Sequence, residues 1–236
     1  MGKIKASVIL PTYNEAGNII DLIEVIQKEL SQKRISHEII VVDDNSPDKT
    51  GLLVQKYFSK VPEVRAIIRK KDRGLATAIK YGIQKAVGEV IMVMDTDFNH
   101  DPKLLPRLFS KTSNYDFVVG SRYIKGGGMA NKSREKLSYI FNLFVRSVLS
   151  SPVKDNLSGF FAIRSKELEK INLDRVFYGY GDYFIRLIYL AMKNGATFTE
   201  VPSFYKEREY GDSKSQFFKM FKDYSQATFN VRFNRN

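Results

Sequence analysis

The stretch EVIMVMDTDFNHD, residues 89–101, places an unbroken apolar run directly before a group of acidic and amide side chains. Val90 to Met94 is apolar at every position, which is typical of a central parallel strand covered by helices on both faces. In open sheets of this kind, ligands bind at the carboxyl ends of the strands. We therefore expect Asp95, Asp97 and Asn99 to lie at one edge of a sheet, in a binding crevice.

Short apolar strands alternate with amphipathic helical patterns through the first half of the chain. The order of these patterns is βαβαβαβ, read from apolar periods of about 2 and 3.6 residues. The segments are ASVILP, EVIQKEL, EIIVVDD, GLLVQKYF, RAIIRK, LATAIKYGIQKA and EVIMVMD. This alternation predicts an α/β fold in which helices flank a parallel sheet.

Polar clusters follow two more of the predicted strands: PTYNE (residues 11–15) after the first and DDNSPD (residues 43–48) after the second. Because parallel strands end at the same edge, we expect all three clusters to face one crevice. The second half is less regular, with helical patterns in residues 134–149 and 183–193 and no internal repeat or linker. We therefore predict a single domain, residues 1–236.

Composition limits the chemistry. The 236 residues carry a net charge of +12 and include no cysteine and two histidines, His37 and His100. Disulfides, thiolate metal sites and cysteine nucleophiles are excluded, and a metal here would be a hard ion held by oxygen ligands. The basic excess indicates a polyanionic partner: nucleic acid, an anionic membrane surface or a phosphorylated small molecule. No apolar run approaches the roughly 20 residues of a membrane span, so we expect none in this sequence.

The acidic cluster also has a purely structural interpretation, because acids at a strand end often cap the next helix or lie solvated in a turn. Asp97 and Asn99 lie two apart on an extended segment and can point their oxygens the same way, which suits a divalent ion that also binds phosphate oxygens. We expect His100 to be a structural hydrogen-bonding group. Asp101 followed by Pro102 predicts an N-cap with proline in the first helical turn.

Four motifs, in this order and spacing, resemble the family 2 glycosyltransferases: VILPTYNE, VVDDNSPDKT, VMDTDFNHDP and VVGSRYIKGGG. Within that family the chain is most similar to the dolichol-phosphate mannose synthase group of polyprenyl-phosphate sugar transferases, from about Ser7 to Lys214. The resemblance implies a GT-A type fold with a Rossmann-like, mostly parallel sheet. It also implies an inverting, metal-dependent transfer of a sugar, most simply mannose, from a nucleotide sugar to dolichyl or polyprenyl phosphate.

The resemblance assigns the donor side to about residues 1–122 and the acceptor side to about residues 123–236. The donor is GDP-mannose or a UDP-sugar, between which the sequence does not choose. The residues that match its binding positions are Pro11, Tyr13, Glu15, Val42, Asp44, Asp95, Asp97, Arg208 and Lys214.

In the same comparison, Asp95 and Asp97 match an Asp-x-Asp pair that binds Mg²⁺ or Mn²⁺ on the diphosphate. Asn99 stands where close relatives have a glutamine ligand, and its shorter amide can reach the ion through a water. A departing diphosphate needs charge stabilisation, which the ion and the basic loop with Arg208 and Lys214 would supply. The alternative for that loop is a solvated polar segment.

Arg122, Arg134 and Ser138 match positions that bind the acceptor phosphate, a task that suits the planar fork of arginine. The catalytic set implied is thus Asp97, Arg122 and Arg208, together with Asp182 as the candidate base. A phosphate acceptor is already ionised and needs no general base, whereas a hydroxyl acceptor does. Asp182 stands where many other family 2 enzymes carry that base, so a glycan or glycolipid hydroxyl is the alternative acceptor. Asp182 is equally compatible with an N-cap of the following helix.

Two amphipathic stretches carry apolar residues at helical spacing among basic ones: Leu137, Ile140, Phe141, Phe144 and Val148, and then Phe217, Phe218, Phe221, Tyr224 and Phe229. Such stripes form core or lie in a membrane interface. We expect a peripheral protein at the cytoplasmic face of a membrane, with a membrane-anchoring partner or a C-terminal transmembrane region beyond this sequence as open alternatives. A nucleotide- or nucleic-acid-binding module is the non-enzyme alternative, although no nucleic-acid-binding motif is present.

Overall fold

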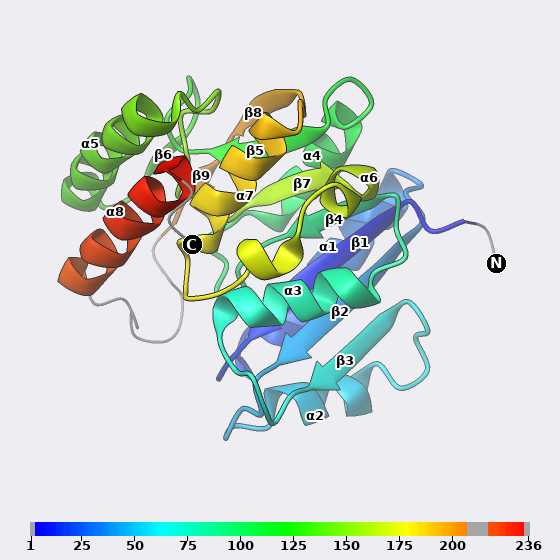
Figure 1. Ribbon diagram of the computed structural model, residues 1–236. Helices are drawn as coiled ribbons and strands as arrows, with labels where there is room; N and C mark the ends of the chain where they lie inside the picture. The colour runs from blue at the N-terminus through cyan, green and yellow to red at the C-terminus, as the bar shows by residue number, and fades with distance from the viewer. Residues whose placement is uncertain (1–2, 207–216, 234–236) are drawn as a thin grey trace.

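The computed structural model describes residues 3–206 and 217–233. Its centre is a seven-stranded sheet with the order β3-β2-β1-β4-β7-β5-β8 (Figure 1). The strands are β1 (Ala6–Thr12), β2 (His37–Asp43), β3 (Val64–Ile68), β4 (Val90–Val93), β5 (Phe117–Ser121), β7 (Phe161–Arg164) and β8 (Phe198–Pro202). All neighbours pair in parallel except β7, which is antiparallel to both β4 and β5. The predicted α/β fold with a mostly parallel sheet is confirmed.

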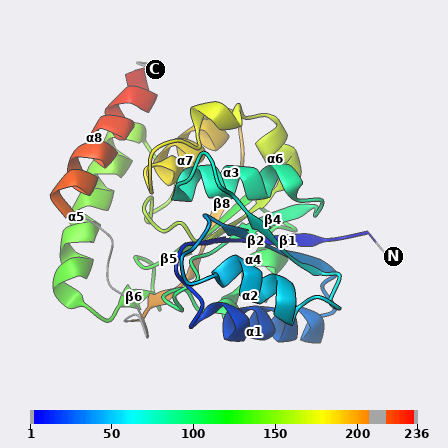
Figure 2. The same ribbon diagram turned by 90° about the horizontal axis from the view of Figure 1, so that it is seen from below.

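Helices cover both faces of the sheet, as Figure 2 shows. One face carries α1 (Ile19–Gln32), α2 (Thr50–Tyr57) and α4 (Leu105–Lys111). The opposite face carries α3 (Leu75–Lys85), α6 (Ser165–Glu169) and α7 (Tyr183–Lys193). The βαβαβαβ order predicted for the first half is therefore correct.

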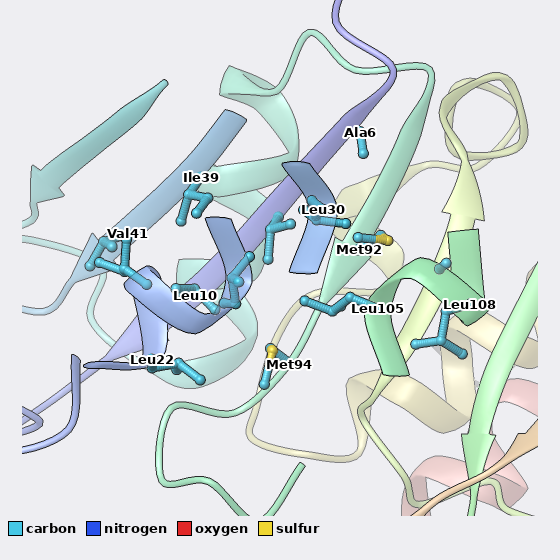
Figure 3. Close-up of a cluster of buried hydrophobic side chains, with 14 of the residues drawn as sticks. Ala6, Leu10, Leu22, Leu30, Ile39, Val41, Met92, Met94, Leu105 and Leu108 are labelled. Atoms are coloured by element: carbon cyan, nitrogen blue, oxygen red, sulfur yellow. The ribbon is translucent and has the colours of Figure 1, made fainter. Parts of the chain in front are cut away.

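Strand β1 supplies both hydrophobic cores. Successive side chains of a strand point to opposite faces of its sheet, so Val8 and Leu10 pack under α1 while Ile9 packs under α3. Figure 3 shows the first of these cores, where Leu10 lies among side chains of α1 and α4. On the other face, a Cβ at Gly82 of α3 would lie 2.5 Å from Ile9 Cγ2, so this glycine lets the helix approach the sheet.

Helices α5 (Lys132–Leu149) and α8 (Phe217–Phe233) lie side by side at one edge of the molecule (Figures 1 and 2). Together with α7 they enclose a third apolar cluster that includes Phe141 of α5 and Tyr224 of α8. The amphipathic stripes are therefore partly core. Other apolar side chains of these two helices remain exposed: Leu137, Tyr139, Ile140, Leu143, Phe221, Phe229 and Phe233. Among the described residues, none of the helices combines the length and hydrophobicity that a bilayer span requires.

Two small elements connect the sheet to these helices. Strands β6 (Gly128–Met129) and β9 (Phe204–Tyr205) pair in parallel beside the main sheet.

The predicted cap at Asp101 is present, because its side chain accepts a hydrogen bond from the Lys103 backbone at the start of the short 3₁₀ helix η1 (Pro102–Leu104). Strands from both halves of the chain share one sheet, since β7 lies between β4 and β5.

Candidate active site

The three polar strand ends line one cavity of about 700 Å³, as the sequence predicts. We call its two parts the β2 side and the α5 side. The β2 side is lined by Pro11, Tyr13, Glu15 and Asp44; the α5 side by Arg122, Arg134 and Tyr205; and Asp95 and Asp97 lie among the same lining residues. Residues from both halves of the chain therefore contribute to the cavity.

The Asp-x-Asp loop after β4 (residues 95–99) is held in one shape by its own contacts. Asp97 is nearly buried, and its two carboxylate oxygens accept from the Asn99 backbone N–H at 3.2 Å and the Asn99 side-chain amide at 2.8 Å. Phe98 between them has a φ of 58°, an unusual conformation for a bulky residue, and its side chain packs against the first core. Asn99 thus orients the Asp97 carboxylate.

The donor atoms of this loop suit a hard divalent cation. Asp95 and Asp97 both line the cavity, and the Asp95 side chain is 46% exposed. Within residues 3–206 and 217–233, no three His, Asp or Glu side chains gather into a metal cluster. Two carboxylates leave most positions around a Mg²⁺ or Mn²⁺ ion to other oxygens, such as those of a diphosphate. Asn99 supports Asp97 directly, and its role as a ligand stays a prediction.

His100 is a structural hydrogen-bonding group, as predicted. Its ring is completely buried and stacks on Phe160, with ring centres 4.8 Å apart. The Nδ1 atom accepts from the Asp95 backbone N–H at 2.9 Å, and Nε2 lies 2.7 Å from the Tyr205 hydroxyl. Burial lowers the pKa of His100 to about 4, so the ring is neutral at pH 7.

On the β2 side, the loop after β3 is tied to the end of β2. Asp44 accepts from Nε of the buried Arg69 at 2.9 Å and from the Gly74 backbone N–H at 2.6 Å. The same loop carries Arg73, whose guanidinium lies 5.0 Å from the centre of the Tyr13 ring. These contacts place a cation and an aromatic face together at the cavity.

Val42 has a different position from its neighbours in the motif. Its side chain is completely buried in the core under α3, outside the residues that line the cavity. The physical reason is the alternation of β2, in which Val41 and Val42 point to opposite faces and both are covered. A contact between the Val42 side chain and a nucleotide is therefore not supported by its placement.

On the α5 side, Arg122 is already paired. Its Nε and Nη2 atoms lie 2.7 and 2.6 Å from the two carboxylate oxygens of the fully buried Asp155. The guanidinium also lies 4.7 Å from the centre of the Tyr205 ring and 5.1 Å from that of Tyr123. Burial alone would lower the pKa of Arg122, but the Asp155 carboxylate raises it above its usual value. Nη1 contacts Met129 Sδ at 3.7 Å.

Arg134 and Ser138 differ in position although they lie on one helix. Arg134 is exposed, lines the cavity and belongs to the first turn of α5, where Asn131 caps the helix by accepting from the Arg134 backbone at 2.9 Å. Ser138 is half-buried, lies outside the cavity lining and contacts the hydroxyl of Tyr123. The structure therefore brings Arg122 and Arg134 to the cavity but not Ser138.

Asp182 precedes α7, and its side chain is engaged in local contacts. It makes no capping hydrogen bond to the helix. One carboxylate oxygen pairs with the buried Arg186, and the other accepts from the Tyr180 backbone N–H at 2.8 Å. Gly181 and Tyr183 line the cavity, whereas Asp182 lies outside that lining. The side chain is used to neutralise Arg186.

The remaining predicted residues, Arg208 and Lys214, lie outside the described residues. Lys206, at the start of that basic segment, lines the cavity.

Residues 7–171 match the model of the family described as glycosyl transferase family 2. The chain belongs to this family. It is 37% identical to a dolichol-phosphate mannosyltransferase of Pyrococcus furiosus over 216 residues, which cover 89% of this chain and 59% of that protein. It is also 33% identical to an undecaprenyl-phosphate mannosyltransferase of Micrococcus luteus over 213 residues, covering 87% and 85% respectively. The chain thus spans less than two thirds of the Pyrococcus relative.

This family 2 glycosyltransferase also resembles solved structures. A glucosyl-3-phosphoglycerate synthase from Mycobacterium tuberculosis, in complex with Mn²⁺, UDP and phosphoglyceric acid, superposes with a TM-score of 0.72 at 18% identity, over 97% of this chain and 78% of that one. The same enzyme with Mg²⁺ and UDP gives a TM-score of 0.71 at 18% identity, over 98% and 79%. At this identity the likeness shows the fold, which is of the GT-A type.

Three residues that line the cavity or support its lining were not found from the sequence of this glycosyltransferase: Arg73, Tyr205 and Asp155, the last of which is buried behind Arg122. Arg73 lies in the loop after β3, so the strand-end rule that selected the loops after β1, β2 and β4 would have selected this loop as well. Tyr205 and Asp155 gave no such signal, because an isolated tyrosine or aspartate in a loop is common. Their position depends on pairing between distant segments.

The buried pair of Arg122 and Asp155 gives a stability prediction. Asp155→Asn should lower the free energy of unfolding by about 3–5 kcal/mol, because it leaves a buried guanidinium without its counter-charge. Urea denaturation would measure this. In the matched control Asp174→Asn, which breaks an exposed pair with Lys80, the change should stay below about 1 kcal/mol. Equal losses in the two variants would show that Asp155 is not the main counter-charge of Arg122.

Proposed function

We propose that this chain transfers a sugar, mannose in the first instance, from a nucleotide sugar to the phosphate of a polyprenyl lipid. The names of its two relatives, which act on dolichol phosphate and undecaprenyl phosphate, support the acceptor and the sugar. The donor would bind on the β2 side and the acceptor phosphate on the α5 side. GDP-mannose is the proposed donor, with UDP-sugars as the alternative because the solved neighbours bind UDP.

One observation carries the choice of a phosphate acceptor: the acid expected to serve as a base for a hydroxyl acceptor is bound to Arg186. Asp182 lies outside the cavity lining, and both its oxygens have partners. A cationic side chain, Arg134, lines the cavity instead. A lipid phosphate is ionised near neutral pH and attacks without a base, so this arrangement suits phosphate better than hydroxyl.

The proposed reaction is a single displacement. A phosphate oxygen of the acceptor forms a bond to the anomeric carbon as the bond from that carbon to the diphosphate breaks, and the nucleoside diphosphate leaves with the electron pair. Attack opposite the leaving group inverts the anomeric configuration. Asp95 and Asp97 would hold a Mg²⁺ or Mn²⁺ ion, which when bound offsets the charge of the diphosphate. The metal complexes of the solved neighbours support this use of a divalent ion.

The protein side of the reaction consists of orientation and charge. Asn99 fixes the Asp97 carboxylate, and Asp155 fixes the guanidinium plane of Arg122. Arg134 would contribute the bidentate contact to the acceptor phosphate, because Arg122 has committed two of its nitrogens to Asp155. Arg208 and Lys214 remain proposed partners of the diphosphate.

The membrane surface is the proposed location, because the acceptor is a lipid. The α5 side of the cavity is bounded by Arg134 of α5 and by Met220 and Tyr224 of α8. These two helices also carry the exposed apolar side chains described above, for example Ile140 at 63% exposure. An apolar helix surface beside basic residues is typical of a helix that lies in a lipid interface.

The acceptor is tested by comparing Arg134→Ala with Asp182→Asn. Arg134→Ala should reduce transfer from GDP-mannose to dolichyl phosphate by ~30- to 1,000-fold, because a charge-assisted contact on the order of 2–4 kcal/mol is lost from the transition state. Asp182→Asn should change the rate per folded molecule only slightly, although it removes the counter-charge of Arg186 and lowers stability. Arg107→Ala, an exposed arginine of α4 outside the cavity lining, is the control.

Radiolabelled transfer, corrected for the folded fraction by circular dichroism, decides between the acceptors. An inactive Asp182→Asn beside an active Arg134→Ala would overturn the phosphate acceptor. That result would favour a glycan or glycolipid hydroxyl.

The metal proposal is tested by Asp97→Ala. This variant should lose the Mn²⁺-dependent part of nucleotide binding while keeping its fold, because an ion ligand at the cavity is removed. Calorimetric titration with GDP and UDP, with and without EDTA, measures the effect. Asp101→Asn removes an acid four residues away but keeps the helix cap, so it should bind as the unchanged protein does. If EDTA has no effect on either protein, the site is not a metal site.

The membrane proposal is tested by flotation with liposomes that contain anionic lipid. The protein should float with them at low salt and less at high salt, since exposed charges are screened beyond about 8 Å at physiological ionic strength. Ile140→Asp should weaken flotation. Val87→Asp, at a similarly exposed position two residues after the end of α3, should not weaken flotation. Equal flotation of both variants would argue against α5 as the contact.

A further inference from the structure

We propose that Tyr205 is a positioning residue that holds the Asp-x-Asp loop and Arg122 in one fixed arrangement. Through it, the site of the metal and donor diphosphate is coupled to the site of the acceptor phosphate. This inference rests on the proposed function, and it adds a residue that neither motif matching nor strand-end position selects. Tyr205 belongs to β9, a two-residue strand that pairs with β6 outside the main sheet.

On the donor side, the hydroxyl of Tyr205 is linked to the Asp-x-Asp loop through the imidazole ring of His100. His100 accepts the Asp95 backbone N–H at Nδ1, so its proton is on Nε2 and is donated to the Tyr205 hydroxyl at 2.7 Å. The imidazole ring of His100 cannot turn freely, because the Phe160 ring stacks on it and the Tyr205 ring packs against it at an interplanar angle of 68°, with ring centres 4.7 Å apart. The Asp95 backbone is thereby connected to Tyr205 by two hydrogen bonds.

The orientation of the Tyr205 hydroxyl is fixed by the hydrogen bonds that it accepts and donates. It accepts from His100 and donates its proton to the Ser158 carbonyl oxygen at 2.7 Å. Burial raises the pKa of Tyr205, so that the phenol stays protonated and able to donate. The Ser158 Oγ lies 3.0 Å away and bonds to the Gly120 carbonyl at the end of β5. Both hydrogen-bonding directions of the hydroxyl are therefore used.

Toward the acceptor, the ring of Tyr205 supports Arg122. The guanidinium lies 4.7 Å from the ring centre, within the range of a cation–π contact, while Asp155 holds two of its nitrogens. Tyr205 and Arg122 both line the cavity, as do Asp95 and Asp97. A shift of the Tyr205 ring would thus move an acceptor-side cation and a donor-side backbone together, which a residue buried only for packing would not do.

Tyr205→Phe separates these two connections. It keeps the ring beneath Arg122 but removes the hydroxyl that receives the His100 proton. The His100 ring, which accepts the Asp95 backbone N–H, then loses the hydrogen bond that fixes its orientation. The Tyr205 ring beneath Arg122 loses the hydrogen bonds that fix its plane. We expect the Mn²⁺ concentration for half-maximal nucleotide binding to rise, and the KM for polyprenyl phosphate to rise with it. A rise of about 3- to 10-fold in each is the range for one hydrogen bond.

Tyr123→Phe is the matched control, because it makes the same chemical change in the other aromatic ring that contacts Arg122. The Tyr123 ring lies 5.1 Å from the guanidinium, but its hydroxyl faces α5, where the Glu135 carbonyl is 3.4 Å away. This hydroxyl bonds toward α5, to Glu135 and Ser138, whereas the hydroxyl of Tyr205 bonds to His100. The control should leave the Mn²⁺ dependence unchanged, whatever its effect on the acceptor KM.

The experiment measures Mn²⁺-dependent GDP binding by calorimetry, which needs no acceptor and no turnover, and then the KM for a short-chain polyprenyl phosphate. Increases in both constants in Tyr205→Phe, with no change of Mn²⁺ dependence in Tyr123→Phe, support the coupling. An increase in only one constant, or equal Mn²⁺ effects in the two variants, overturns it. If the unchanged protein does not use a lipid phosphate at all, the proposed function fails, and the Mn²⁺ measurement still tests the donor half of the coupling.

A second pair of variants covers the case in which Tyr205→Phe does not fold. His100→Gln offers an acceptor and a donor in place of the two ring nitrogens, whereas His100→Leu offers neither. Weaker Mn²⁺-dependent binding in His100→Leu, with recovery in His100→Gln, is the expected result. Equal binding by both folded variants would show that the hydrogen bonds through His100 do not position the loop.

Discussion

The complete burial of strand β1 is the constraint on which the rest of the molecule depends. All seven residues from Ala6 to Thr12 are buried, and parallel neighbours pair with the strand on both sides. The chain leaves β1 toward α1 on one face but reaches β4 from α3 on the other. Because β1 runs parallel to both β2 and β4, the loops after these three strands leave the sheet at the same edge, where the cavity lies. The cavity follows from the topology before any particular side chain is considered.

The sequence predicts the elements of this architecture well because their patterns are local. Unbroken apolar runs such as Ile39 to Val42 mark central strands, and the 3.6-residue period of residues 183–193 matches α7. What the patterns do not contain is the position of β7, a four-residue strand inserted antiparallel between β4 and β5. A short apolar segment carries no signal for its neighbours or its direction, since these are set by long-range packing.

The same distinction applies to the site. Asp95 and Asp97 were found from their position, because the loop that follows a buried parallel strand lies at the crevice. Asp182 was selected by its match to a family position, and the structure shows it paired with Arg186 four residues later on the next helical turn. That spacing was visible in the sequence and predicts an ion pair within one helix. A motif match thus needs to be weighed against the local partners that could occupy the same side chain.

The pairing of Arg122 with Asp155 bears on product release as well as on acceptor binding. In the proposed reaction the acceptor monoester carries between one and two negative charges near neutral pH, because its second pKa is about 6, whereas the diester product carries one. An isolated arginine would retain either anion strongly. With its charge compensated by Asp155, Arg122 offers directional N–H groups more than net charge, and the exposed Arg134 supplies the cation. Affinity then falls as the monoester becomes a diester, so the site that orients the acceptor need not hold the product.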